Sequence, residues 1–501
     1  MAGKSLVRSR RGGRLMWLQG TLTATPQDIA NGLLAFMVFI EITALGVNDQ
    51  LLQAYANILN IFIALAVLNW LKADLAFWKQ IAYPFLALAL GLTWACLPVF
   101  ATTYDLWSVM PGAKPPRPVP DLQFSGGLRF VSQMAILMTA TLVGYRRASM
   151  RALVDWILIF GLANLVLGLL LRWVDPQHVW GMAKTMHEFR FTGTFQNANV
   201  AGVLFGALGL LALGELLALI EFGGIHHAAA ARGWSTFYAL CAFAFFGALL
   251  ITASRSAIVL TILAGTALAI RPYIVRKMGL KGALIGFVIA AVMLALVLFA
   301  ASTLDLPVLA RFSQVGPDSV YRSAIYGRFW QIYLDSPLFG YGLSSFSDVN
   351  LAYLESAREA REFGYINAAH NQLLQLLMAG GWPFLAAHII AIAIIVRRSV
   401  SQGTLSGASA LAPWLALLVV LGCSMIDIAL TVPAILTFCI VIIGNMWGRG
   451  VRTRLDAIML ANKPKSYYAW KKAKLREQQT DAGSGTTGDS APFKQAVSRT
   501  N

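Results

Sequence analysis

Four side chains have types and positions that suit chemistry on an anion and a hydroxyl: Arg190, Arg255, Arg322 and His370. Arginine offers a planar fork of hydrogen-bond donors that matches phosphate and pyrophosphate oxygens. Histidine ordinarily titrates near neutral pH, so it can take a proton from a hydroxyl group. These residue types predict a site where a group leaves a phosphate and joins a hydroxyl.

Arg255 interrupts an apolar stretch, residues 234–270, within the sequence ITASRSAIVL. Arg232 and Arg271 flank the stretch and belong on one side of a membrane, so it is expected to be a hairpin that turns at TASRS. The return limb, residues 256–270, gives about 22 Å of helix against a hydrocarbon core of about 30 Å, which predicts a turn sunk below the outer surface. An arginine there either snorkels to the interface, pairs with a carboxylate, or marks a site.

Arg190 opens the sequence RFTGTFQNANVAG just before another apolar segment. Gly193 lets the backbone turn, and Asn197 or Asn199 can cap the following helix. An arginine beside a helix N-terminus suits an anion, because free backbone N–H groups point the same way. The alternative is a loop cation with asparagines that only cap.

The longest polar loop contains YRSAIYGRFWQIYLDSPLFGYGLSSF and ends in NAAHNQLLQLLMAGG. Arg322 and Arg328 are expected on nearly opposite sides of one amphipathic helix, so at most one faces a site. His370 and Asn371 stand where the next apolar segment begins, and His370 is either an interfacial polar residue or a general base. The loop should pack as helices over the site, because several of its apolar residues need a surface: Phe329, Trp330, Tyr333, Leu334, Leu338 and Phe339.

Metal ligation is not predicted by these loops. None contains two carboxylates spaced one apart, and His178, His187 and His370 form no local ligand motif. Neutralisation of phosphate would then depend on arginine, so no metal and no cofactor are expected. The four cysteines lie singly in apolar segments and are expected to be core residues.

Composition places these loops in a membrane protein. The chain of 501 residues is 57% hydrophobic and 13% charged, whereas soluble chains are about one quarter charged. The net charge of +17 lies in loops between apolar runs, which excludes a nucleic-acid surface as its explanation. Twelve transmembrane helices are predicted, at residues 29–47, 51–70, 79–100, 127–145, 152–171, 196–220, 234–252, 256–270, 282–303, 371–396, 410–428 and 431–447.

Basic clusters such as Arg146, Arg147 and Arg151 orient these helices with both termini in the cytoplasm. The predicted organisation is a basic cytoplasmic N-terminus (1–28), a transmembrane domain (29–448) with an outer loop at 302–369, and a basic, largely disordered cytoplasmic tail (449–501). No removable signal peptide is expected. One topology then puts Arg190, Arg255 and His370 at outer helix ends, so the three are expected to converge on one cavity.

Four sequence pieces, RFTGTFQNAN, TASRSA, Arg322 with Tyr326 and LDSPLFGYGLSSF, and AHNQLLQLLMAGG, occur in this order on the same predicted face. In these pieces the chain resembles the O-antigen ligase and O-antigen polymerase superfamily of bacterial membrane proteins, from about Arg190 to Gly381. Tyr326 stands where many relatives have tryptophan, and either aromatic can stack on a sugar.

The resemblance implies an all-α, GT-C-type fold and metal-independent transfer of a glycan from an undecaprenyl-pyrophosphate donor at the periplasmic face of the inner membrane. It implies that Arg190 and Arg255 hold the pyrophosphate, that Arg322 helps to bind donor or acceptor, and that His370 activates the acceptor hydroxyl. Substrate contacts are also expected from the asparagines of the same motifs: Asn197, Asn199 and Asn371.

The expected partners are the undecaprenyl-pyrophosphate-linked glycan, a lipid or saccharide acceptor and membrane lipid, with no nucleic acid. The acceptor stays open: a ligase acting on lipid A-core or a similar acceptor is favoured, the alternative is a polymerase of O-antigen or exopolysaccharide, and protein O-glycosylation ranks lower. A flippase for lipid-linked sugars is the non-enzyme alternative, but transporters tend to show internal symmetry, whereas these cations gather toward one face.

Overall fold

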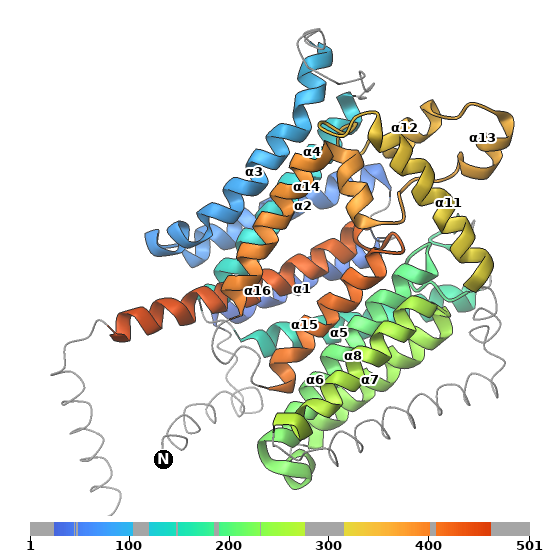
Figure 1. The fold of residues 1–501 in the computed structure, drawn as a ribbon. Helices are drawn as coiled ribbons and strands as arrows, with labels where there is room; N and C mark the ends of the chain where they lie inside the picture. The colour runs from blue at the N-terminus through green and yellow to red at the C-terminus, as the bar shows by residue number, and fades with distance from the viewer. Residues whose placement is uncertain are drawn as a thin grey trace, which may run out of the picture. The chain divides into compact units, whose positions relative to one another are not determined.

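The chain is almost entirely helical wherever its structure, a computed structural model, describes it: residues 25–44, 46, 49–103, 120–146, 149–184, 190–230, 232–275, 315–400 and 407–461. It divides into two compact units, Met1–Val451 and Arg452–Asn501. The elements in Figure 1 are α1 (Pro26–Thr43), α2 (Gln50–Leu71), α3 (Leu75–Thr103), α4 (Pro120–Tyr145), α5 (Met150–Val174), β1 (His178–Val179), β2 (Met182–Ala183), α6 (Ala198–Ala230), α7 (Arg232–Thr252), α8 (Arg255–Val275), α11 (Val315–Leu334), α12 (Phe346–Ala352), α13 (Ala357–Phe363), α14 (Gln372–Ser399), α15 (Ala408–Ser424), the short 3₁₀ helix η3 (Ala429–Thr431) and α16 (Pro433–Ala461).

Each predicted transmembrane segment that falls in the described residues contains a helix, but the segment predicted at 410–428 is helical only as far as Ser424. Among those residues, eight helices are long and apolar enough to cross a membrane, and α15 is a shorter apolar helix. Several expectations lie outside the described residues: the span at 282–303, most of the basic N-terminus, His187, and the tail after residue 461.

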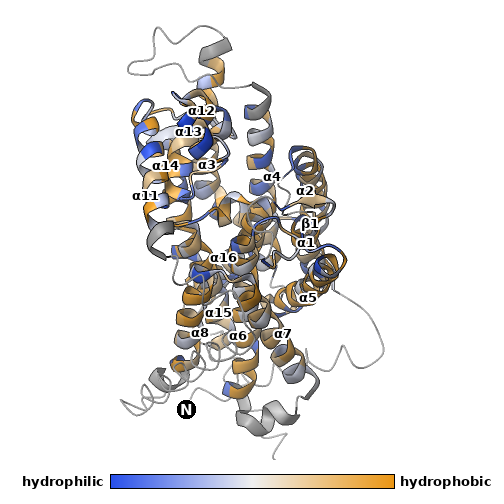
Figure 2. Ribbon diagram, turned by 90° about the vertical axis from the view of Figure 1, so that its right-hand side faces the viewer, coloured by the Kyte–Doolittle hydropathy of each residue, from blue (hydrophilic) through white to orange (hydrophobic). Residues whose placement is uncertain are grey.

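Large apolar side chains on the outer faces of these helices fit a lipid environment. Phe62 on α2 is 67% exposed, Phe243 on α7 is 81% exposed and Leu263 on α8 is 61% exposed. Figure 2 shows hydrophobic colour along α5, α7 and α8, whereas α13 is largely hydrophilic. Exposed apolar surface on this scale is not found on soluble monomers, so the protein is a membrane protein.

The expected hairpin at Arg255 is present, since α7 ends at Thr252 and α8 begins at Arg255. The return limb is longer than expected, since α8 has 21 residues, but α8 is not among the eight helices that are long and apolar enough to cross a membrane. The helix continues past the predicted end at Ile270 through a basic residue, Arg271, which ion-pairs with Glu221 of α6 at 3.0 Å.

Helices α6, α7, α8 and α15 pack together, and they appear side by side in Figure 1. At the turn end of α6, Gly202 makes the close approach possible. A Cβ atom at this position would lie 2.6 Å from Cβ of Ser254 and 2.8 Å from Oγ1 of Thr252. The glycine therefore lets the TASRS turn lie directly against the first turns of α6.

The long loop forms helices, as expected, and its described part shares a core with α14. Ile325 and Phe329 of α11, Phe346 of α12 and Leu374 of α14 are all buried in one cluster. The expectation that every apolar residue of the loop finds cover is wrong for Trp330 and Leu334, which are 46% and 48% exposed on the outer side of α11. Their helix buries its other face, where Ile325 and Phe329 lie.

The glycine-containing turn that follows α11 packs against the two adjacent glycines of α14. We call this contact the joint. Gly380 and Gly381 break the helical geometry of α14, and Gly381 has φ of 69°. The turn that follows α11 enters this break, where Tyr341 N–H donates to the Met378 carbonyl at 2.7 Å and Gly342 N–H donates to the Ala379 carbonyl at 3.0 Å. The joint fixes the loop relative to the first turns of α14, which directly follow His370.

We expect Gly381→Ala to destabilise the protein, because the new Cβ would lie 2.3 Å from the Leu338 carbonyl oxygen in a left-handed backbone. The loss should reach about 2 kcal/mol or more, the combined scale of left-handed strain and a backbone clash. Thermal aggregation in detergent measures it. Gly327→Ala on α11 is the matched control, since nothing lies within 4 Å of its Cβ position. Equal melting of the two variants would contradict this account of the joint.

Candidate functional site

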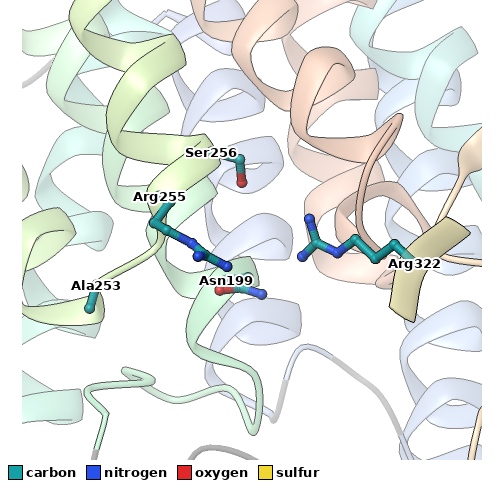
Figure 3. A pocket seen from close by; sticks show the side chains of 5 residues that line it. All are labelled: Asn199, Ala253, Arg255, Ser256 and Arg322. Atoms are coloured by element: carbon teal, nitrogen blue, oxygen red, sulfur yellow. The ribbon is translucent and has the colours of Figure 1, made fainter. Parts of the chain in front are cut away.

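Two arginines from opposite sides face a common pocket. Arg255, in the first turn of α8, and Arg322, on α11, line it together with Asn199, Ala253 and Ser256. Figure 3 shows both guanidinium groups pointing into the space between the helices. This recess has a volume of about 280 Å³.

Arg190 lies behind this recess and is 8% exposed. Its Nε donates to the Thr252 carbonyl at the end of α7 (2.8 Å), and one terminal nitrogen donates to Oδ1 of Asn199 (2.8 Å). The arginine thus joins the RFTGTF turn to the TASRS turn. Arg190 is not itself among the residues that line the pocket.

Asp427, between α15 and η3, connects the site residues. Its Oδ2 accepts from Nδ2 of Asn199 at 2.7 Å and lies 3.4 Å from a terminal nitrogen of Arg322. Its Oδ1 lies 3.3 Å from Nδ1 of His370 and accepts from the backbone N–H of Ile428 at 2.8 Å. One carboxylate therefore holds side chains from α6, α11 and the start of α14.

The carboxyl group of Asp427 is strongly acidic in this setting. Burial raises its pKa, but the hydrogen bond and charge of His370, the charge of Arg322 and the Ile428 N–H outweigh burial and lower the pKa to about 2. Asp427 is therefore ionised at neutral pH and carries the negative charge that balances the neighbouring cationic groups.

His370 is held by its backbone as well as by its ring. It has φ of 52°, an uncommon left-handed conformation for a residue other than glycine, and its carbonyl accepts from the Tyr326 hydroxyl at 3.1 Å. Ala253, two residues before Arg255, is left-handed too, with φ of 51°. Left-handed strain concentrates at functional turns, and here it precedes both α8 and α14.

The two ring nitrogens of His370 lie in different surroundings. In the neutral form of the ring, a carboxylate beside Nδ1 favours the tautomer that carries its proton on Nδ1, so that Nε2 is the nitrogen able to accept a proton. The side chain of His370 is 28% exposed, while that of Asp427 is 5% exposed. The imidazole can therefore meet a substrate while its partner stays buried.

Of the three residues expected to converge on one cavity, Arg255 lines the pocket, whereas Arg190 and His370 are joined to its lining through neighbouring side chains. Asn199 contacts Arg190 directly, shares the pocket with Arg255, and is joined to His370 through Asp427. Residues 180 positions apart in sequence are thereby connected through two side chains, Asn199 and Asp427.

The asparagines have different roles. Asn197 caps α6 by accepting from the N–H of Asn199 at 2.8 Å, and Asn371 caps α14 by accepting from the N–H of Leu373 at 3.0 Å. Asn371 also donates to the Met425 carbonyl at 2.8 Å. Of the three asparagines expected to contact substrate, Asn199 alone is among the residues that line the pocket.

Arg322 and Arg328 lie on different sides of α11, as expected. Arg328 points away from the pocket, with Glu359 at 3.2 Å, the Tyr353 carbonyl at 2.9 Å and the Phe363 ring centroid at 5.1 Å. It is a structural cation, which leaves Arg322 as the arginine of α11 that faces the site.

Sequence reasoning missed Asp427. The residue was included in the predicted span at 410–428, where it is the only acidic residue. The rule that drew attention to Arg255, that a charge in an apolar segment needs a partner, applies equally to this carboxylate.

Comparison with known proteins identifies one family. Residues 240–389 match the family model described as O-antigen ligase. The matched range contains Arg255, Arg322 and His370, whereas the RFTGTFQNAN turn with Arg190 precedes it and Asp427 follows it. No curated protein matches the chain.

Proposed function

We propose, from the match of residues 240–389 to the O-antigen ligase family model, that the protein is a metal-independent membrane glycosyltransferase of the O-antigen ligase and polymerase superfamily. It moves a glycan from an undecaprenyl-pyrophosphate donor to a hydroxyl of a lipid A-core or similar acceptor. The reaction takes place at the periplasmic face of the inner membrane, with both termini of the chain in the cytoplasm.

The observation that carries the proposal is the grouping of Arg255 and Arg322 around one recess, with His370 joined to Arg322 through Asp427. Two arginine forks facing one space suit a pyrophosphate, which presents several anionic oxygens. The N-terminus of α8 adds backbone N–H groups and the positive end of its dipole.

The proposed donor contacts differ among the arginines. Arg255 and Arg322 bind pyrophosphate oxygens directly. Arg190 adds positive charge from outside the recess and keeps Asn199 in place through a hydrogen bond of 2.8 Å. Arginine charge here takes the part that divalent metal ions take in many enzymes that use phosphate leaving groups. Negative charge grows on the leaving pyrophosphate, so these contacts strengthen in the transition state.

His370 acts as the general base. Its Nε2 accepts the proton of the acceptor hydroxyl as the hydroxyl oxygen attacks the anomeric carbon of the donor sugar. The bond from that carbon to the pyrophosphate oxygen breaks, and undecaprenyl pyrophosphate leaves with the electron pair. Asp427 stabilises the imidazolium that forms, in the way that a buried aspartate supports the histidine of a hydrolase triad.

Deletion of the gene, followed by analysis of cell-surface polysaccharide, tests the function and separates its alternatives. A ligase deletion should leave long polymer on the undecaprenyl carrier and none on lipid A-core. A polymerase deletion should leave single repeat units on lipid A-core. Unchanged lipopolysaccharide and exopolysaccharide, with full complementation controls, would contradict both.

A further inference from the structure

Arg129 is a second intramembrane arginine, and the reaction described above does not use it. It lies in the transmembrane segment of α4, where an arginine needs a compensating partner. One terminal nitrogen donates to the Thr431 carbonyl at 2.6 Å, across 302 positions of sequence. Thr431 is the last residue of η3, the short helix that follows Asp427.

The segment that carries Asp427, residues 425–431, is held at several points. Asn371 donates to the Met425 carbonyl at 2.8 Å, and Asn199, Arg322 and His370 contact the Asp427 carboxylate. Those contacts come from the site. Arg129 holds the opposite end of the segment from a helix outside the site.

Internal hydrogen bonds connect the Arg129 contact to the carboxylate. The Thr431 hydroxyl donates to the Ile428 carbonyl at 2.6 Å, and the Thr431 N–H donates to the same oxygen at 2.9 Å. The N–H of Ile428 in turn donates to Oδ1 of Asp427 at 2.8 Å. A shift of the Thr431 carbonyl would therefore move the peptide that positions Asp427.

We propose that Arg129 is a positioning residue for this active site: it fixes the 425–431 segment through the Thr431 carbonyl and so sets the place of Asp427 beside His370 and Arg322. The proposal rests on the proposed function for its catalytic consequence. Its structural part, the anchoring of the segment, stands separately. A carbonyl acceptor in a low-dielectric setting makes such a charge-assisted hydrogen bond strong.

The test compares Arg129→Met, Arg129→Lys and Gln133→Met in purified protein. Gln133 is the matched control, since it lies one turn deeper on α4 and bonds Thr437 of α16 at 3.0 Å without touching the segment. Arg129→Met should lower kcat by about 10- to 100-fold, the scale of a displaced catalytic group, with the KM for the lipid-linked donor changed by less than about 3-fold. Arg129→Lys should recover part of kcat, and Gln133→Met should keep it.

A double mutant asks whether Arg129 acts through Asp427. Asp427→Asn alone should be impaired, and adding Arg129→Met should lower kcat no further, because the residue that Arg129 positions has already lost its charge. Additive losses in the Asp427 cycle would overturn the proposal.

Hydrogen exchange provides a readout that needs no activity. Arg129→Met should speed amide exchange in residues 425–431 by about 10-fold or more, since the segment loses an anchor, and Gln133→Met should not. If the wild type fails to transfer glycan but exchange responds as stated, the proposed function is wrong and the anchoring stands. If transfer is normal and Arg129→Met changes neither kcat nor exchange, the anchoring is wrong.

Discussion

His370→Asn is expected to lower the turnover of glycan transfer by about 100-fold or more, the usual scale of general-base catalysis. Asparagine is the informative replacement because it tolerates the left-handed backbone at this position, where φ is 52°. The loss should then report the missing base rather than a rearranged loop. Binding of the undecaprenyl-pyrophosphate glycan should stay nearly unchanged, since the arginines that face the recess remain.

The measurement is single-turnover transfer by purified protein alongside donor binding. His178→Ala is the matched control, because this histidine has a carboxylate partner as well, Asp175 at 2.9 Å, but belongs to the hairpin after α5. It should transfer at the wild-type rate. Normal turnover of His370→Asn would contradict the assignment of His370 as the general base. Loss of donor binding would show that His370 binds pyrophosphate instead.

Replacing Arg255 is expected to produce the second large effect. Arg255→Ala should lower kcat by about 100- to 1000-fold, the scale reported for removing a donor that stabilises transition-state charge. Arg255→Lys should remain impaired by about 10-fold or more, because lysine keeps the charge but lacks the bidentate fork. Both should also weaken binding of the donor.

Arg328→Lys controls for the general effect of exchanging arginine for lysine in this protein. Arg328 is engaged with Glu359 on the far side of α11, so its exchange should leave kcat within about 3-fold of wild type. Full activity of Arg255→Lys would mean that the residue supplies charge alone. Full activity of Arg255→Ala would mean that the recess lined by Arg255 and Arg322 is not where pyrophosphate binds.

The helices could be predicted from sequence because a membrane span needs a long apolar run and the chain contains little else. The ends of the helices were harder to predict. Helix α8 passes Arg271 and ends at Val275, since the arginine finds an ion-pair partner in Glu221. A partner contributed by another helix allows a charge inside a continuous helix, and sequence spacing alone does not reveal such a partner.

The candidate site could be predicted from the sequence only in part, for a related reason. Arg190, Arg255 and His370 stand at the ends of apolar segments, where a change of composition draws attention to them. Asp427 and Arg129 are single charges inside segments that are otherwise apolar, and their partners lie far away along the chain: Asp427 contacts Asn199 across 228 positions, and Arg129 contacts Thr431 across 302. Pairing such charges requires the helix packing, which hydrophobic periodicity does not specify.

At the helix N-caps, by contrast, one local sequence pattern was compatible with two roles. Asn197 and Asn371 each precede a helix, where the side chain can cap or can bind a ligand. The structure has both side chains accepting from N–H groups of the following turn. Asn199 does not cap. Its amide bridges Arg190 and Asp427, a role that depends on residues distant in sequence.

Transfer by the purified wild-type protein is the most direct test of the proposed chemistry. The protein, reconstituted in liposomes, is given an undecaprenyl-pyrophosphate glycan with either lipid A-core or a second lipid-linked glycan as acceptor, in the presence and absence of a chelator. The account predicts that glycan appears on an acceptor with release of an equal amount of undecaprenyl pyrophosphate, at the same rate with chelator present. Absence of transfer to both acceptors, or transfer that the chelator abolishes, would contradict it.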